Sequence, residues 1–268
     1  RRQHEEAVAL LRLPLLLALG FIVGLQAQEK PLALKGALVI PIVGEPIANG
    51  VLVVQAGRII TVGPAASTPI PAGAEVIDAT GKVVMPGLVD SHSHIGGGSG
   101  GDGSSALHAD ARVLDAIDAR DPSIQKAQAG GITTANVMPG SGHLISGQTL
   151  YLKLRDGRIV DDLLIPLPDG SPAGGLKMAN GTNSIKAAPF PGTRAKSAAL
   201  VRDLYIKAQE YREKIRRAGG DAEKRPARDL ALEELVEVLE GRRVVQHHTH
   251  RHDDILTVLR LAREFGFK

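Results

Sequence analysis

The sequence of 268 residues contains no cysteine and no tryptophan, and aromatic residues make up only 3% of it. Without cysteine, the chain can form no disulfide, thiolate zinc site, iron–sulfur cluster or cysteine nucleophile. Any metal ion must therefore be held by histidine, by carboxylate or by a modified lysine. The scarcity of aromatics and a formal net charge of only +3 argue against nucleic-acid binding, which uses a basic surface with stacking rings.

The first residues differ in character from the rest. Arginines at positions 1, 2 and 12 precede an apolar run at 13–25, and the small residue Ala27 follows it. This order is typical of a secretory signal peptide, and the run is too short for a comfortable membrane span. We therefore expect residues 1–27 to be a signal peptide and the protein to be exported, periplasmic or secreted, with no stable membrane insertion after leader removal. A buried N-terminal helix is the alternative.

Residues 28–85 have the pattern of a small β unit. Short alternating apolar segments at 37–43, 50–55 and 58–62 are separated by Gly, Pro and Asn. The second and third segments are joined by Gln55-Ala56-Gly57-Arg58, which predicts a β-hairpin with Gly57 at the tight position.

From Val83 onward, apolar segments alternate with helical patterns. The segments predict strands at 83–89, 132–138, 150–154, 176–179 and 243–248, and helices at 109–119, 123–129, 197–218, 229–240 and 253–265. Ser197 and Asp253 are the expected N-caps of the third and last of these helices. Strands that alternate with helices indicate an α/β fold with a parallel sheet, open or closed into a barrel.

Six of the nine histidines lie in two clusters, each at the end of an expected strand. His92 and His94 follow the apolar run VVMPGLVD, and residues two apart in a strand project to the same side. The second cluster repeats this spacing with His248 and His250, and a helix follows. Active sites of α/β barrels lie at the carboxyl ends of the strands, where converging imidazoles are good ligands for Zn²⁺. A chance exposed pair and a surface histidine tract are the alternatives.

The stretch from Val76 to His94, with the sequence VIDATGKVVMPGLVDSHSH, resembles the N-terminal signature of the amidohydrolase superfamily, and best matches its imidazolonepropionase-like branch. Later stretches at 129–134, 147–149, 176–181 and 248–255 are similar to the same branch and occur in the same order. The resemblance implies a (β/α)8 barrel of the TIM type with a small β-sandwich built from both chain ends. Residues 86–268 would then be an incomplete barrel of about five βα units, and residues 28–85 the N-terminal part of the sandwich.

The resemblance also implies roles for individual residues. His92 and His94 match the metal ligands after the first barrel strand, and His248 matches the ligand after the fifth, with His250 as the close alternative. Lys177 matches the position at which some members carry a carboxylated lysine that bridges two metal ions, whereas an ordinary loop lysine is its other interpretation.

Two further residues are candidates for supporting roles. Asp90 is expected either to orient an imidazole from behind the metal or to be an ordinary strand-end residue. His143, in the loop after the second strand, is expected either to contact substrate or to lie on the surface.

The implied activity is metal-dependent hydrolysis of a C–N bond in an amide, cyclic amide or peptide-like substrate by a metal-activated water. One or two Zn²⁺ ions are expected as cofactor, with Mn²⁺ or Fe²⁺ as alternatives. The expected partner is a small-molecule or peptide-like substrate, and homo-oligomerisation stays open. The general base, usually an Asp after the eighth strand, is expected beyond Lys268, because the stretch from Val83 to Lys268 is shorter than the about 250 residues of a complete barrel.

Two other functions stay open at this point. The chain could be a truncated or degenerate family member without activity on its own. It could also be a histidine-rich metal-binding protein that uses the tract at 247–252, in which case binding would not depend on His92.

Overall fold

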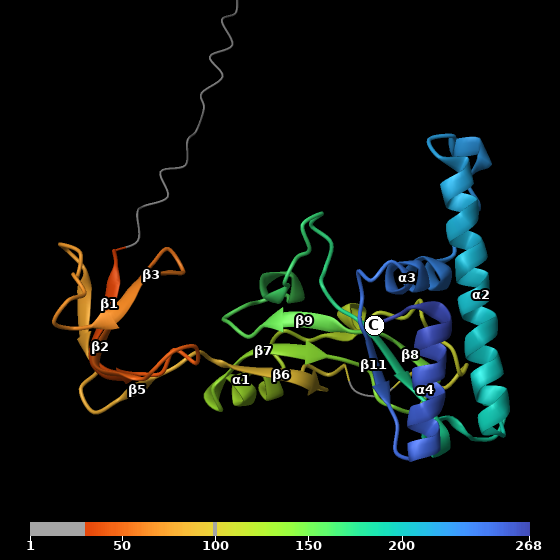
Figure 1. The fold of residues 1–268 in the computed structure, drawn as a ribbon, viewed down its shortest axis with the longest axis horizontal. Coiled ribbons are helices and arrows are strands. Elements are labelled where there is room, and N and C mark those ends of the chain that lie inside the picture. Colours follow the sequence, from red (N-terminus) through yellow and green to blue (C-terminus); the bar gives the residue numbers. More distant parts are fainter. Residues whose placement is uncertain (1–29, 99–100) are drawn as a thin grey trace, which may run out of the picture. The chain divides into compact units, whose positions relative to one another are not determined.

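The computed structural model describes residues 30–98 and 101–268, so the expected signal peptide at 1–27 lies outside the described residues. The chain divides into two compact units, with the boundary between Pro86 and Gly87 (Figure 1). Each unit is described by itself below.

The first unit is one five-stranded sheet. Its strands are β1 (Leu32–Val39), β2 (Ile47–Gln55), β3 (Arg58–Pro64), β4 (Glu75–Asp78) and β5 (Val83–Val84). The order is β3-β2-β1-β4, and β5 also pairs with β1. The pairs β1–β2 and β2–β3 are antiparallel, whereas β4 and β5 run parallel to β1.

The predicted hairpin between β2 and β3 is confirmed. Gln55 pairs with Arg58, and the two residues between them, Ala56 and Gly57, have φ values of 48° and 70°. Positive φ at both central positions gives the turn the twist that a two-residue hairpin requires. Before this hairpin, β1 begins at Leu32 and ends at Val39, earlier than the expected 37–43, because its first half pairs with both β2 and β4.

The second unit contains two three-stranded sheets. One has the order β6-β7-β9, formed by β6 (Leu88–Ser93), β7 (Ile132–Val137) and β9 (Leu150–Lys153). The other has the order β11-β10-β8, formed by β8 (Ile145–Gln148), β10 (Leu176–Ala179) and β11 (Val245–His248). The pairs β6–β7 and β10–β11 are parallel, so the strands that carry His92 and His248 each run beside a parallel neighbour.

The expectation of uniformly parallel strands is wrong for the segment after β7. β8 is antiparallel to β10, and β9 is antiparallel to β7. A parallel return needs a long crossover, usually through a helix, and residues 138–149 provide only a loop and β8. The chain therefore passes at Thr149 from one sheet directly to the other.

The helices of the second unit are α1 (Pro122–Ala129), α2 (Arg194–Ala218), α3 (Leu230–Leu239) and α4 (His252–Phe265). Four 3₁₀ turns accompany them: η1 (Val113–Ala116), η2 (Val160–Leu163), η3 (Gly181–Ser184) and η4 (Ala222–Lys224). The helix expected at 109–119 is reduced to η1. Its backbone instead bonds to β8, because Arg112 forms a bridge with Gln148, and Gln148 N–H donates to the Ala111 carbonyl at 2.8 Å.

Two of the expected helix caps are wrong. α2 begins one turn early, at Arg194, with Thr193 as N-cap, and the Ser197 hydroxyl donates to the Thr193 carbonyl inside the helix. α4 has Arg251 at its N-cap position, and Asp253 lies in the first turn, where its carboxylate is bound by the Arg251 guanidinium.

The larger core of the second unit lies between α2, α3, α4 and the β10 sheet. Tyr205 of α2 is fully buried, and its ring centroid lies 5.0 Å from that of Phe265 and 5.3 Å from that of Phe267. This aromatic group holds α2 and the end of α4 together. Among the described residues, we find no helix with the length and apolarity that crossing a membrane requires.

Candidate active site

A cavity of about 700 Å³ in the second unit is lined by residues of β6, β7, β10 and β11. It is lined by fourteen residues: Val89, Asp90, Ser91, His92, Thr134, Ala135, Asn136, Tyr151, Ile165, Lys177, Gln246, His247, His248 and Thr249. Residues of β6, β10 and β11 that are far apart in sequence therefore face one space. This volume is large enough for a small-molecule substrate.

His92 and Lys177 meet in this cavity. The Lys177 Nζ lies 3.4 Å from His92 Nε2, although the residues are 85 positions apart. Lys177 is only 1% exposed, and burial lowers the pKa of its amine. The pKa of His92 is also lowered, first by burial and then by the charge of Lys177. Both shifts favour the neutral nitrogen, which is the form that coordinates a metal ion and, for lysine, reacts with carbon dioxide.

The ring of His94 is oriented by a backbone carbonyl. Its Nδ1 lies 2.7 Å from the Met138 carbonyl oxygen at the end of β7. Because a carbonyl can only accept, Nδ1 carries the hydrogen, and the neutral ring keeps its lone pair on Nε2. A hydrogen bond of this kind is what usually orients a metal-ligating histidine. The centroids of the His92 and His94 rings are 5.2 Å apart.

His248 and His250 also lie side by side. Their Nε2 atoms are 2.8 Å apart, and the Asn183 Nδ2 lies 3.1 Å from His248 Nε2. His248 lines the cavity, and the pKa of its ring is lowered by burial and then by His250. His250 is exposed and is not among the cavity-lining residues. His247 also lines the cavity, and burial lowers its pKa to about 4.

The structure places the two candidates for supporting roles in different surroundings. Asp90 lines the cavity, and its Oδ1 accepts a hydrogen bond of 3.0 Å from the backbone N–H of His92. It thus orients the backbone that carries His92. His143 is only 5% exposed and lies against Phe190 and His108, outside the set of residues that line the cavity.

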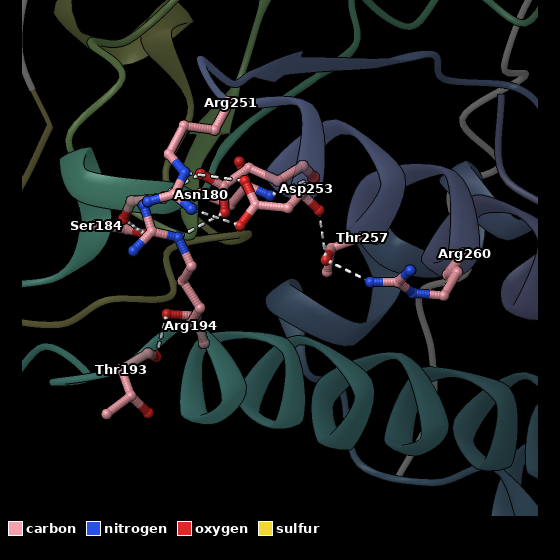
Figure 2. Close-up of polar contacts among 11 residues, drawn as sticks. Asn180, Ser184, Thr193, Arg194, Arg251, Asp253, Thr257 and Arg260 are labelled. Carbon is pink, nitrogen blue, oxygen red and sulfur yellow. Dashed lines mark hydrogen bonds and ion pairs between the residues drawn. The ribbon is translucent and has the colours of Figure 1, made fainter.

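A half-buried ion pair joins the start of α2 to α4, the helix after β11. Figure 2 shows the Arg194 guanidinium reaching from the start of α2 toward Asn180 and the start of α4. Arg194 Nε lies 2.9 Å from Asp254 Oδ1, and the Asn180 amide donates to the Asp254 carbonyl at 3.0 Å. Asp254 is only 3% exposed, so loss of Arg194 would leave an unpaired buried charge. The Asn180 bond thus ties the residue after β10 to α4, whereas the separation of Lys177 and His248 is set by the direct pairing of β10 with β11.

Sequence reasoning did not find Arg194, Asp254, Asn183 or the cavity-lining Tyr151. An acidic residue in the first turn of a helix is ordinarily attributed to the helix dipole, so Asp254 gave no separate signal. Asn183 could have been noticed only as a polar residue in the loop after an expected strand.

Comparisons with known proteins agree with the motifs. The model of an amidohydrolase family matches residues 75–136. The crystal structure of an amidohydrolase from Thermotoga maritima MSB8 matches with a TM-score of 0.80 and 33% identity, covering 88% of this chain and 63% of that chain. These matches support the amidohydrolase superfamily for this chain. This superfamily consists of hydrolytic enzymes that act on C–N bonds and generally use divalent metal ions.

Curated relatives support the imidazolonepropionase-like branch of the superfamily. An imidazolonepropionase from Rhizobium rhizogenes is 30% identical over 151 residues, which are 45% of this chain and 37% of that protein. A 5-methylthioadenosine/S-adenosylhomocysteine deaminase from Symbiobacterium thermophilum is 46% identical over 65 residues, which are 24% of this chain and 15% of that protein. The chain thus spans much less than two thirds of the length of either relative.

Proposed function

We propose that this chain carries the first part of the catalytic domain of a metal-dependent hydrolase that cleaves a C–N bond in an amide, cyclic amide or peptide-like substrate. The observation that carries the proposal is the convergence of His92, Lys177 and His248 from three separate strands, β6, β10 and β11, on one cavity. In the proposed architecture, β6, β7, β10 and β11 are strands of an incomplete (β/α)8 barrel, and the first unit is the N-terminal part of a composite β-sandwich.

The donor set fits a divalent metal ion of the zinc type. His94 has its lone pair on Nε2 because Nδ1 is bonded to Met138, and burial favours the neutral forms of His92, His248 and Lys177. Within the described ranges, however, no three His, Asp or Glu side chains already stand in the arrangement that holds a metal ion. Lys177 is therefore an important part of the proposed set, because a carboxylated lysine supplies the negative charge that the imidazoles lack.

We propose His92, His94 and His248 as metal ligands, with Lys177 as the bridging ligand if two ions bind. When bound, the metal ion would lower the pKa of a coordinated water toward ~7 and polarise the substrate carbonyl. Zn²⁺ suits these ligands, and Mn²⁺ or Fe²⁺ are alternatives.

Other cavity residues offer groups that bind an amide substrate. Three buried oxygens that line the cavity, Asn136 Oδ1, Gln246 Oε1 and Thr249 Oγ1, find no hydrogen-bond partner within residues 30–98 and 101–268. Buried acceptors without partners are costly unless a ligand or water satisfies them. They would accept hydrogen bonds from substrate N–H groups and so orient the amide.

The test uses the purified protein with and without the paired change His92→Ala plus His94→Ala. We expect stoichiometric Zn, Mn or Fe in the unchanged protein, and loss of both metal and cyclic-amide or dipeptide hydrolysis, by at least about 100-fold, in the variant. His252→Ala is the matched control, because it removes an exposed histidine from the second cluster. Hydrolysis that survives the paired change, or metal bound only through the tract at 247–252, would contradict the proposal.

The proposed cellular location of the protein rests on the sequence alone. We propose export to the periplasm or the medium because of the basic and apolar pattern of residues 1–27. N-terminal sequencing of the protein from whole cells tests the proposed removal of residues 1–27. A mature protein that retains residue 1 would contradict the proposed export.

A further inference from the structure

One side chain contacts the proposed metal site from outside the cavity. Asn183 lies in η3, the 3₁₀ turn that follows β10, and it is not among the residues that line the cavity. Its Nδ2 nevertheless lies 3.1 Å from Nε2 of His248, a residue 65 positions further along the chain. Asn183 therefore meets the site through the His248 ring.

The orientation of the Asn183 amide follows from a second contact. Its Nδ2 also lies 3.2 Å from the carbonyl oxygen of Ser141, in the loop between β7 and β8. A carbonyl oxygen can only accept a hydrogen bond, so the part of the amide that faces Ser141 is the NH₂ group and not the oxygen. This nitrogen carries two hydrogens, which serve Ser141 and His248.

The Asn183 donor determines which nitrogen of the His248 ring carries the hydrogen. An amide nitrogen does not accept a hydrogen bond, so Nε2 of His248 must supply the lone pair. A neutral imidazole has a single N–H group, which in this ring is then on Nδ1. The choice between the two ring nitrogens is therefore made by a side chain from another segment.

The same donor sets the direction of the neighbouring contact between two histidines. Nε2 of His250 lies 2.8 Å from Nε2 of His248. Because the His248 nitrogen accepts, the hydrogen between the two rings belongs to His250. Two donors, from Asn183 and His250, thus share the single lone pair of one nitrogen.

The turn that carries Asn183 is anchored on both sides of this contact. Ser184, the next residue, is fully buried. Beyond it, the Nζ of the exposed Lys186 donates to the Gly142 carbonyl at 2.8 Å, one position after Ser141 in the same loop. The Asn183 amide is therefore held against the loop and the histidine ring, and Lys186 provides a second link to that loop.

We propose that Asn183 is a positioning residue that keeps the hydrogen of His248 on Nδ1 and competes with a metal ion for the lone pair on Nε2. This inference rests on the proposed function, because it takes His248 as a metal ligand. Coordination through Nε2 requires the Asn183 hydrogen bond to break. Coordination through Nδ1 requires the ring hydrogen to move to Nε2, where it meets the amide hydrogen. The Asn183 contact therefore weakens metal binding at either nitrogen.

The hydrogen positions are tested by ¹⁵N NMR of the whole chain with labelled histidine, at about pH 8, where the imidazoles are neutral, and without added metal. A ring nitrogen that carries hydrogen and one that has a lone pair give separate signals, and His248→Gln identifies those of His248. We expect Nδ1–H in the wild type and a mixture of both forms in Asn183→Leu. Asn183→Asp should give Nε2–H, because a carboxylate only accepts.

Lys186→Met is the matched control, because it cuts the neighbouring link to the same loop and leaves the Asn183 amide in place. It should keep the wild-type signals of His248. If Asn183→Asp also keeps them, or if Lys186→Met changes them as Asn183→Leu does, the amide does not position the ring and the proposal is wrong. Circular dichroism of each variant verifies that it is folded.

The competition is tested by calorimetric titration of the whole chain with Zn²⁺. Asn183→Leu should bind Zn²⁺ about two- to tenfold more tightly than the wild type, which corresponds to one net hydrogen bond. Lys186→Met should stay within about twofold, because the charge it removes is exposed and screened. Equal or weaker binding by Asn183→Leu would overturn the proposal. A wild type that binds no Zn²⁺ would contradict the proposed function instead, and the ¹⁵N spectra would still decide whether Asn183 positions His248.

Discussion

The two ends of strand β11 differ in whether the charged side chains near them form ion pairs. Just before it begins, Arg243 is 9% exposed, and its Nε lies 3.0 Å from Glu234 Oε2 and 2.5 Å from Glu237 Oε2. Where the strand ends, His248 faces the cavity that contains the buried Lys177, and in the described part of the chain no acidic side chain forms an ion pair with that lysine.

One end of the strand thus contributes to the stability of the fold, and the other end to the proposed function. At the amino end, opposite charges pair and contribute to folding. At the carboxyl end, basic nitrogens are brought together with the Asp90 carboxylate in the same cavity but with no ion pair to Lys177 among the described residues. This costs folding free energy but leaves lone pairs for a ligand. This division agrees with α/β barrels, in which the carboxyl end carries the chemistry.

The largest expected effect comes from breaking the ion pair at the amino end. Above about pH 8, where Glu234 is ionised, Arg243→Met leaves this buried carboxylate without its partner, and we expect a loss of about 3–5 kcal/mol in the free energy of unfolding there. Arg242→Met is the control, because Arg242 is 44% exposed and its ion pairs should be worth no more than about 1 kcal/mol. Urea unfolding of both variants measures the difference. Equal losses would show that Arg243 has no special role.

The second effect is a pH dependence due to Glu234. Burial raises the pKa of this carboxyl to about 8, against an ordinary value of 4.5. As pH rises from about 4.5 toward 8, the unfolded chain releases this proton while the folded chain retains it, so stability falls. We expect the wild type to lose about 2–4 kcal/mol more than Glu234→Gln over this range. Parallel pH profiles of unfolding would contradict the assignment.

The smallest expected effect on stability is at the carboxyl end. Lys177→Met replaces a buried amine with an apolar side chain of similar length, so the free energy of unfolding should stay unchanged or rise by about 1 kcal/mol. Metal affinity of the proposed catalytic site should fall at least about tenfold in the same variant. A loss of stability like that of Arg243→Met would mean that Lys177 is a structural residue, and the contrast between the two ends would be wrong.

Local signals predicted much of the fold. The Gln55–Arg58 hairpin followed from Gly57 between two alternating segments, and Asp229 was correctly placed at the start of α3. The expected helix at 109–119 failed because its backbone pairs with β8, a partner more than thirty positions away in sequence. Helical spacing describes one segment at a time and gives no information about such a partner.

The candidate site shows the same division. The sequence by itself determined the positions of His92, His94 and His248, because apolar runs ending in spaced histidines are local patterns, and it matched a known superfamily through them. Only the tertiary structure placed Lys177 beside His92, reversed β9 against β7, and buried His143 with His108 away from the cavity. These features arise from pairing and packing between segments that are distant in the sequence. Many segments compete to pair with the same backbone and to pack in the same core, and no local pattern encodes the outcome of that competition.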